Sequence, residues 1–258
     1  MSGYATKGLV RLAFAGVLAV GLWIVSLAIG VESRAGLEDA LGPTLPPPSG
    51  PAIVGYARVV DGDTIEVAGR RIRLEGIDAP ETSQTCPRRW SAGWGWNRDW
   101  DAGHAATRHI AKLVEGREVH CMPLGTDRYR RTLGVCSVDG HEINADLVRQ
   151  GLAWAFVKYS LRYVDVEKEA RAARRGIWQA PCQPAWDYRA NRWSAEASGA
   201  PEGCAIKGNI SRNGRIYHMP WSVWYAKTRI EPARGERWFC SEAEALAAGW
   251  KPARTGAR

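Results

Sequence analysis

The sequence VVDGDTIEVAGRRIRLEGIDAPE, residues 59–81, decides the fold because it alternates short β-branched runs with tight turn signals. An Asp-Gly-Asp turn separates the first two runs, and Gly-Arg separates the second from the third. Short runs of Val, Ile and Thr bounded by Gly and Asp are typical of an antiparallel meander. We therefore expect strands over residues 56–60, 64–67 and 71–77.

The chain continues with two further strand patterns and three helical ones. Strands are expected near residues 117–122 and 131–138. Helices are expected near residues 104–115, 143–150 and 163–175, each followed by a glycine where a helix would stop. Five short strands with helices between and after them predict an α+β fold built on a small barrel.

Charged residues gather in the same opening stretch. Asp63 lies beside a glycine turn, Asp78 lies just past the third strand, and Glu81 follows three residues later. A hard cation such as Ca²⁺ takes oxygen ligands, so two aspartates and the carbonyl of Ala79 would supply an open site. Glu81 would then hold or deprotonate a bound water. The forked guanidinium of Arg73 suits phosphate oxygens.

Each of these residues taken alone is more often a turn carboxylate or an exposed arginine. Their combination within residues 63–81 favours a metal site beside a phosphate clamp. The chain is also basic, with a formal net charge of +8 and a pI of about 9.4. Such a charge attracts nucleic acid or an anionic membrane surface, although a solvated basic face is the alternative.

Three motifs, VVDGDTIEV, RIRLEGIDAPE and DRYRR, resemble the thermonuclease (staphylococcal nuclease-like) family. The resemblance spans roughly residues 53–178. It implies a five-stranded OB-fold barrel with three helices. It also implies a Ca²⁺-dependent nuclease that hydrolyses phosphodiester bonds of DNA, RNA or both.

The resemblance carries roles to individual positions. Asp63, Asp78 and the carbonyl of Ala79 would bind Ca²⁺. Arg73, Glu81 and Arg131 would be catalytic, the arginines clamping the phosphate and the glutamate positioning or deprotonating the attacking water. The residues that would contact the nucleotide are Asp127, Arg128, Tyr129 and Tyr159.

Two features depart from the family pattern. Arg130 stands where the family usually has glycine, which puts the shape of the turn before Arg131 in doubt. Residues 82–103 form a tryptophan-rich insertion that would cap the site, stack on bases or pack against the barrel. Neither departure removes an active-site position.

An N-terminal segment precedes the barrel. Residues 12–31 form an uncharged apolar run that follows Lys7 and Arg11, long enough to cross a bilayer with the N-terminus in the cytoplasm. We expect an uncleaved membrane anchor rather than a cleaved signal, and either one exports the rest of the chain. Proline-rich residues 32–52 would form a semi-extended tether. The folded part would be a periplasmic or extracellular monomer.

Six cysteines agree with export, because none has the C-x-x-C spacing of a zinc site. Six cysteines allow 15 pairings. We favour Cys121 with Cys136 across a hairpin and Cys204 with Cys240 in one C-terminal module, which leaves Cys86 with Cys182.

The chain therefore divides into an anchor (1–31), a linker (32–52), a barrel domain (53–180), a connector (181–200) and a small C-terminal module (201–258). Trp178, Trp186 and Trp193 of the connecting region should pack on the barrel. The module resembles one appended to some bacterial exported nucleases. Turns are expected at Gly208-Asn209 and Asn213-Gly214, and a helix over residues 241–248 begins with a capping box of Ser241 and Glu244. His218 is a possible ligand, although a packed histidine is more common.

Two other functions remain open from the sequence. The barrel would be a tethered nucleic-acid-binding domain without catalysis, or the C-terminal module would be the active unit of an anchored interaction protein. A pure binder has no need of Glu81, Arg73 and Arg131 together.

Overall fold

The computed structural model describes residues 47–87, 99–127, 129 and 131–253, which lie within one compact unit, residues 41–258. In these ranges no helix is both long and apolar enough to cross a membrane. The expected anchor at residues 12–31 lies outside them, as do most of the linker, Arg128 and Arg130.

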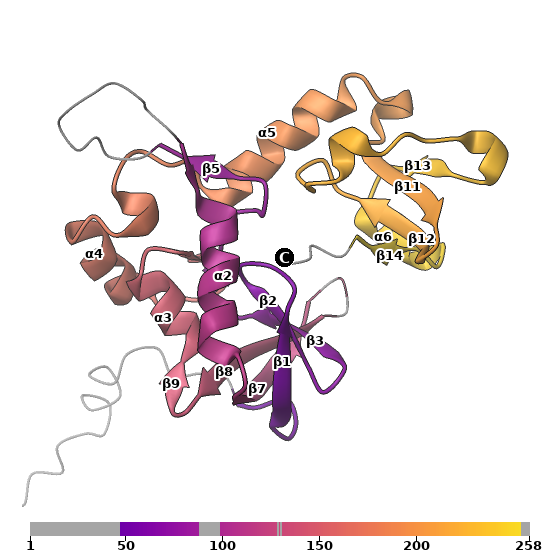
Figure 1. Ribbon diagram of the computed structural model, residues 1–258. Helices are drawn as coiled ribbons and strands as arrows, with labels where there is room; N and C mark the ends of the chain where they lie inside the picture. The colour runs from indigo at the N-terminus through magenta and orange to yellow at the C-terminus, as the bar shows by residue number, and fades with distance from the viewer. Residues whose placement is uncertain (1–46, 88–98, 128, 130, 254–258) are drawn as a thin grey trace, which may run out of the picture. The chain divides into compact units, whose positions relative to one another are not determined.

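Five strands form a closed barrel (Figure 1). They are β1 (Ile53–Val59), β2 (Thr64–Val67), β3 (Arg70–Leu74), β7 (Glu118–Thr126) and β8 (Thr132–Val138). Neighbours pair in the order β3-β2-β1-β7-β8, and a parallel pairing of β3 with β8 closes the ring. The short strand β9 (His141–Glu142) extends the sheet beyond β8. The expected α+β fold and five-stranded OB-type barrel are confirmed.

The barrel closes around side chains that alternate along each strand. In β8 every second residue is buried, as an amphipathic strand requires. Ile65, Ile72, Leu74 and Val119 are fully buried in this core. Burial of one such side chain contributes about 1.5–3 kcal/mol, so the core fixes the ring of strands that carries the site.

The third expected strand, residues 71–77, is in fact two strands. Gly76 has φ +74° and separates β3 from β4 (Ile77–Asp78), which pairs with β10 (Trp154–Ala155) instead of continuing the barrel. A Cβ at Gly76 would lie 2.9 Å from the Tyr163 ring, so both the backbone and the packing favour glycine. The break moves Asp78 out of the barrel ladder.

The three expected helices are present as α2 (Ala102–Val114), α3 (Ile143–Arg149) and α4 (Val164–Ala172). Figure 1 shows α2 running alongside the barrel. Ala106, Ile110 and Val114 of α2 are spaced four residues apart and join the barrel core. Asp101 caps the start of the helix by accepting a hydrogen bond from the backbone N–H of His104 at 3.4 Å.

The connector contains a helix that the sequence did not predict, α5 (Ala185–Ala197). Near its start lies a small apolar cluster where Trp178 and Trp186 pack against Trp154, with ring centroids 6.4 and 6.0 Å apart. The short strands β5 (Thr85–Cys86) and β6 (Trp100–Asp101) border this cluster. Trp193 packs instead on the core of the C-terminal module, so the expectation that all three tryptophans pack on the barrel is wrong.

The C-terminal module is a four-stranded sheet with one helix. Its strands pair in the order β13 (Arg237–Phe239), β11 (Ile206–Ser211), β12 (Gly214–His218) and β14 (Lys251–Pro252). Helix α6 (Glu242–Ala247) and the 3₁₀ turns η2 (Gly176–Trp178), η3 (Pro201–Gly203), η4 (Tyr225–Lys227) and η5 (Pro232–Arg234) complete the described elements. The core of the C-terminal module consists of Ile206, Tyr217, Phe239, Ala245 and Trp250.

Of the two turns expected in the module, one is present and the other is not. Asn213-Gly214 joins β11 to β12, as expected. Gly208 and Asn209 instead lie inside β11. A Cβ at Gly208 would come within 2.5 Å of the Phe239 ring, which explains a glycine within this strand. This glycine makes room for the core and does not form a turn.

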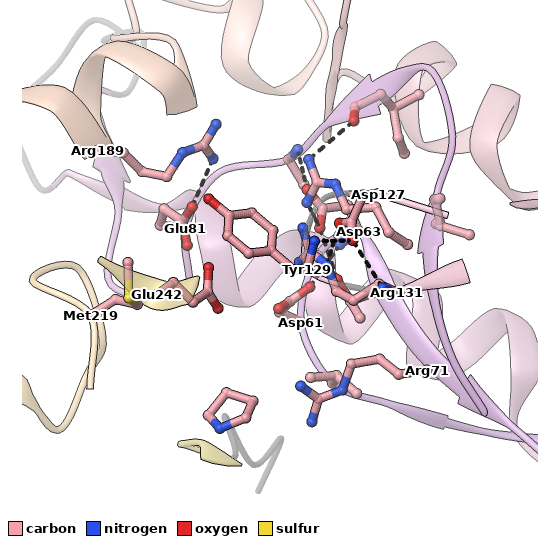
Figure 2. Close-up of a pocket in the computed structure, with 18 of the residues that line it drawn as sticks. Asp61, Asp63, Arg71, Glu81, Asp127, Tyr129, Arg131, Arg189, Met219 and Glu242 are labelled. Atoms are coloured by element: carbon pink, nitrogen blue, oxygen red, sulfur yellow. Dashed lines mark hydrogen bonds and ion pairs between the residues drawn. The ribbon is translucent and has the colours of Figure 1, made fainter. Parts of the chain in front are cut away.

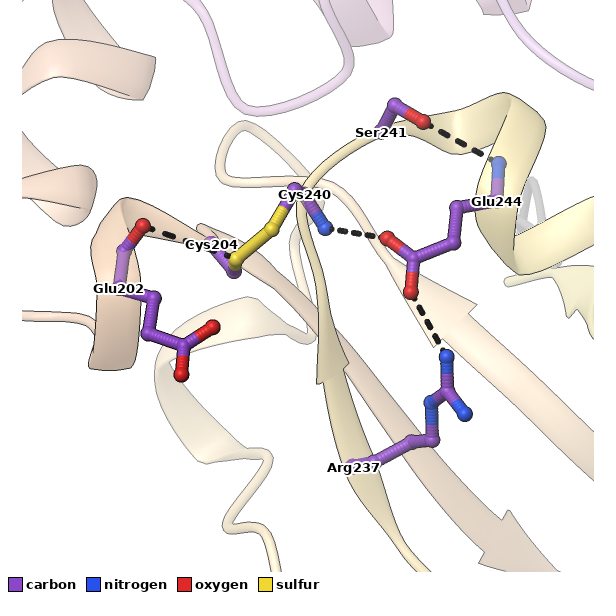
Figure 3. Close-up of a disulfide and its surroundings, with 6 residues drawn as sticks. All are labelled: Glu202, Cys204, Arg237, Cys240, Ser241 and Glu244. Atoms are coloured by element: carbon purple, nitrogen blue, oxygen red, sulfur yellow. Dashed lines mark hydrogen bonds and ion pairs between the residues drawn. A yellow bond between two sulfur atoms is a disulfide. The ribbon is translucent and has the colours of Figure 1, made fainter.

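Three disulfides join the cysteines in the expected pairs, Cys86–Cys182, Cys121–Cys136 and Cys204–Cys240. Figure 3 shows the third bridge at the start of α6. There Ser241 accepts from the backbone N–H of Glu244 at 3.2 Å. The Glu244 carboxylate accepts from the backbone N–H of Cys240 at 2.9 Å. The expected cap is therefore present, with its return bond one residue earlier than in a standard capping box.

Candidate active site

A cavity of 1520 Å³ lies where the β1–β2 turn, the segment after β3 and the β7–β8 loop meet. Residues of α5 and of the C-terminal module also line it. Figure 2 shows the side chains that point into it. The predicted site residues that line this cavity are Asp63, Arg73, Ala79, Glu81, Asp127, Tyr129, Arg131 and Tyr159. Asp78 is buried beside them, and Arg128 lies outside the described residues.

Asp63 immediately precedes β2 and is 5% exposed. Its Oδ2 accepts the backbone N–H of Ala79 at 3.0 Å, and its Oδ1 accepts from Arg73. Burial by itself raises the pKa of this carboxyl. The positive charge of Arg73 and the hydrogen bond from Ala79 outweigh that effect, so the pKa is lowered and Asp63 stays ionised.

Arg73 bridges the two aspartates from the middle of the β3 ladder. One terminal nitrogen donates to Asp63, and the other donates to Asp78 Oδ1 at 2.8 Å and to the Ile77 carbonyl at 3.4 Å. Asp78 is fully buried, so its charge depends on such partners. Burial by itself lowers the pKa of Arg73. The charges of Asp63 and Asp78 outweigh that effect, so the pKa lies above its ordinary value and Arg73 stays charged.

Glu81 lies in a loop that is pressed against the start of α2. Its carbonyl accepts the backbone N–H of Gln84 at 2.7 Å, and Gly103 in turn donates its N–H to the Gln84 carbonyl at 3.1 Å. A Cβ at Gly103 would lie 1.9 Å from the Glu81 carbonyl oxygen, so this approach requires glycine. Desolvation by burial raises the pKa of Glu81 to about 8, although 22% of the side chain is exposed to the cavity.

The β7–β8 loop is held by one carboxylate. Asp127 Oδ1 accepts from the backbone N–H groups of Tyr129 and Arg131, both at 2.9 Å. Asp127 Oδ2 accepts from Arg131 Nε at 2.7 Å. The guanidinium of Arg131 lies 5.4 Å from the centre of the Tyr129 ring. Asp127 thus orients the second arginine, as Figure 2 shows.

Tyr159 lies at the rim of the cavity with 68% of its surface exposed. It packs edge-on against Phe156, with centroids 5.0 Å apart, and Lys158 Nζ lies 5.6 Å from its ring. An exposed ring beside a lysine is suited to contact with a base or sugar.

The sequence did not predict two residues of the site, one acidic and one basic. Asp61 accepts from the backbone N–H of Asp63 at 3.2 Å. Burial first, and the nearby Asp63 charge second, raise the pKa of Asp61 to about 6. Its place in the Asp-Gly-Asp turn was the available signal.

Arg189 of α5 is the other missed residue. Its guanidinium spans both oxygens of Asp78, with Nη1 to Oδ1 at 3.1 Å and Nη2 to Oδ2 at 2.7 Å. Nη1 also donates to Glu81 Oε1 at 2.8 Å (Figure 2). Helical spacing of Trp186, Arg189 and Trp193 was a signal for this helix, but it could not indicate the distant partners.

The donor set of this cavity is chemically suited to a hard divalent cation, because it consists of carboxylates around a turn. Among the residues that the structure describes, no three acidic, histidine or cysteine side chains are arranged as a ready metal cluster. Asp63, Asp78 and Glu81 are instead each paired with a guanidinium. A cation would fit these donors once at least one arginine moves.

Comparisons with known proteins identify two segments. The staphylococcal nuclease homologue family matches residues 71–180, and the ArfC family matches residues 187–252. An uncharacterized endonuclease of Escherichia coli O157:H7 is 38% identical over 140 residues, covering 51% of this chain and 81% of that protein.

Two further relatives match the chain over a similar length. The micrococcal nuclease of Shigella flexneri is 34% identical over 150 residues, covering 51% of this chain and 77% of that protein. The succinoglycan biosynthesis protein ExoI of Rhizobium meliloti (strain 1021) is 33% identical over 148 residues, covering 57% of this chain and 75% of that protein.

The barrel, its arginine- and carboxylate-lined cavity and these relatives define a hydrolytic nuclease. The chain belongs to the staphylococcal nuclease homologue family, with an ArfC module after the barrel.

Proposed function

We propose that this nuclease hydrolyses phosphodiester bonds of DNA, RNA or both with the help of Ca²⁺, and that it does so outside the cytoplasm. The observation that carries the proposal is the convergence of Asp63, Asp78 and Glu81 with Arg73 and Arg131 around one cavity. Carboxylates for a cation and two arginines for a phosphate are what phosphodiester hydrolysis needs.

Asp63, Asp78 and the carbonyl of Ala79 are the groups that would hold Ca²⁺. When bound, the cation would stabilise the negative charge that develops on the phosphate and lower the pKa of a coordinated water. Asp63 suits this role because its lowered pKa keeps it ionised. Asp78 suits it because two oxygens are fixed at a buried position beside the cavity.

Glu81 is the group that would accept a proton from the attacking water. Its pKa, raised to about 8 by burial, lies close to neutral pH, where a general base is most effective. The Gly103 contact and the Gln84 hydrogen bonds fix its backbone, so the carboxylate has a defined place relative to Asp78.

Arg73 and Arg131 would bind the phosphate from two sides of the cavity. Arg131 uses Nε for Asp127, and its two terminal nitrogens donate to no residue in the described part of the chain. These nitrogens remain available for two phosphate oxygens. Tyr129 and Tyr159 would contact the adjoining nucleoside.

The location is proposed from the N-terminal sequence and the disulfides. The apolar run at residues 12–31 would anchor the chain, with the nuclease on the far side of the membrane. Three disulfides favour an oxidising compartment, where they persist and where Ca²⁺ is available.

Digestion of single- and double-stranded DNA and RNA by the full chain, with Ca²⁺ or with EGTA, tests the proposal. We expect cleavage only with Ca²⁺. Glu81→Gln should lower kcat about 10²–10⁴-fold through loss of the base. Arg131→Ala should lower it about 10²–10³-fold through loss of a charge-stabilising donor.

Arg117→Ala is the matched control, because Arg117 is exposed and bonds Lys112 and Asp139, away from the cavity. It should cleave like the parent chain. Undiminished cleavage in EGTA would contradict the role of Ca²⁺, and full activity of both site variants, with circular dichroism showing intact folds, would contradict the residue roles.

A further inference from the structure

Arg189 comes from outside the barrel and makes three hydrogen bonds to the carboxylates at the centre of the site. It lies on α5, within the segment that matches the ArfC family. Arg73 and Arg131, the arginines proposed to bind the phosphate, belong to the barrel strand β3 and the β7–β8 loop. The connector helix α5, which lies largely in the ArfC-matched segment, therefore contributes a charge to the nuclease site.

We propose that Arg189 is an internal cation that holds Asp78 and Glu81 in a closed state, and that Ca²⁺ binds there only by displacing it. The inference rests on the proposed role of Asp78 as a Ca²⁺ ligand. It assigns to the ArfC-matched segment, residues 187–252, a function in this chain: control of cation entry to the site.

The occupancy of the Asp78 oxygens supports the proposal. Oδ1 already accepts from Arg73 at 2.8 Å and from Arg189 at 3.1 Å, and Oδ2 accepts from Arg189 at 2.7 Å. A carboxylate oxygen has two lone-pair sites, so Oδ1 is saturated. Ca²⁺ binds oxygen at about 2.3–2.6 Å, a position next to Oδ2 that the guanidinium now occupies with like charge.

The charges also explain why a cation is needed at this position. Asp63 and Asp78 share Arg73, and Glu81 lies beside them at the cavity wall. Without Arg189, Glu81 would lose its ion pair, and Asp63 and Asp78, both almost fully buried, would share the bonds of Arg73. Buried like charges require a counter-charge, which either Arg189 or a divalent ion can supply.

Arg189 is better placed to leave than Arg73 is. Arg73 lies on β3, which is paired on both sides, with β2 and with β8. Arg189 has 23% of its side chain exposed, and Ala185 is the one buried residue of α5. A long, partly exposed side chain on a helix outside the barrel can rotate out without opening the barrel core.

The contacts of α5 with the module set where Arg189 points. Arg192, one turn further along, donates to the Pro220 carbonyl through Nε at 3.3 Å and Nη2 at 3.1 Å. Ser83, two residues after Glu81, donates to the Trp221 carbonyl at 2.6 Å. The placement of the module and the affinity of the site for Ca²⁺ are therefore linked, and each must influence the other.

The test compares Ca²⁺ affinity of the full chain with that of Arg189→Gln and Arg117→Gln, by calorimetric titration. Removal of the competing cation should tighten Ca²⁺ binding about tenfold or more in Arg189→Gln, within the range of allosteric couplings. Arg117→Gln makes the same change at an exposed arginine that bonds Lys112 and Asp139 away from the cavity, so it should bind Ca²⁺ within about twofold of the parent chain. Arg189→Lys retains the charge with fewer bonds and should give an intermediate affinity.

Unchanged or weaker Ca²⁺ binding in both Arg189 variants would overturn the proposal. If those variants also lost cleavage at saturating Ca²⁺, Arg189 would be a phosphate ligand and not a competing cation. These results leave the proposed function standing, because the parent chain would still bind Ca²⁺ and cleave. If neither the parent chain nor any variant bound Ca²⁺, the proposed function would fail with the inference.

Discussion

The barrel and the C-terminal module hold their structures by different means. The barrel returns on itself through β3 and β8, and every one of its five strands has a neighbour on both sides. The module is an open sheet whose outer strands, β13 and β14, are three and two residues long. Its five-residue core is fastened by Cys204–Cys240.

This difference shows which contributions to the site are fixed and which are adjustable. Arg73 lies on β3 opposite Thr64 of β2, and Asp63 immediately precedes Thr64, so the separation of Asp63 from Arg73 follows from the barrel ladder. Arg189 depends on a helix and a module with a much smaller core. Perturbing each region separately tests whether the two really behave differently.

Removal of the module disulfide should have the largest effect. Cys204 and Cys240 enclose 36 residues, and a bridge of that span stabilises by about 2–4 kcal/mol. The double variant Cys204→Ser/Cys240→Ser should unfold the module at a lower temperature and leave the barrel transition in place. Calorimetric melting curves measure this.

Cys121→Ser/Cys136→Ser serves as the comparison. That bridge joins directly opposite residues of the paired strands β7 and β8, so its loss should affect the barrel transition only. A single melting transition that shifts equally in both double variants would show that barrel and module unfold as one unit.

Gly103→Ala tests the barrel side of the comparison. The added methyl would meet the Glu81 carbonyl oxygen, so the backbone must shift, at a cost of about 1–3 kcal/mol. Movement of Glu81 should also lower kcat. Gly199→Ala is the control, since a Cβ there meets no atom within 4 Å. Equal melting temperatures and rates for both variants would contradict the close approach.

Acid should destabilise the module through His218. Burial, and then the charge of Lys207, lower its pKa from 6.5 to about 4. Nε2 bonds Asn209 at 2.9 Å, and buried Nδ1 has no hydrogen-bond partner among the described residues. Below pH 6.5 the unfolded state takes up a proton that the folded state refuses.

Stability of the module should therefore fall by up to about 1.4 kcal/mol per pH unit between pH 6.5 and about 4, with no contribution above pH 6.5. Urea unfolding at several pH values, followed by tryptophan fluorescence, measures this slope. In His218→Gln the slope over that interval should be smaller, and an identical slope would contradict the assignment to His218.

Local patterns were sufficient to predict the barrel. Burial alternates along residues 132–138, and the glycine and aspartate turns lie where strands end. Proximity along a hairpin and elimination predicted all three disulfides. The placement of Asp63, Arg73 and Asp78 follows from the barrel and from a family resemblance.

Tertiary contacts determine what the sequence could not predict. The break at Gly76 depends on the ring of Tyr163, and the strand position of Gly208 depends on Phe239. The bond of Arg189 to Asp78 joins residues 111 positions apart. No local periodicity contains such a separation.

The Cys86–Cys182 bridge gives that distant contact an entropic advantage. It joins residues 96 positions apart, one five residues after Glu81 and the other seven residues before Arg189. With the bridge closed, the two charged groups are connected through a path of about a dozen residues rather than more than a hundred, a shorter loop that costs less entropy to close. The bridge thus raises the effective concentration of the Arg189 guanidinium at Glu81, much as a short linker does between two binding partners.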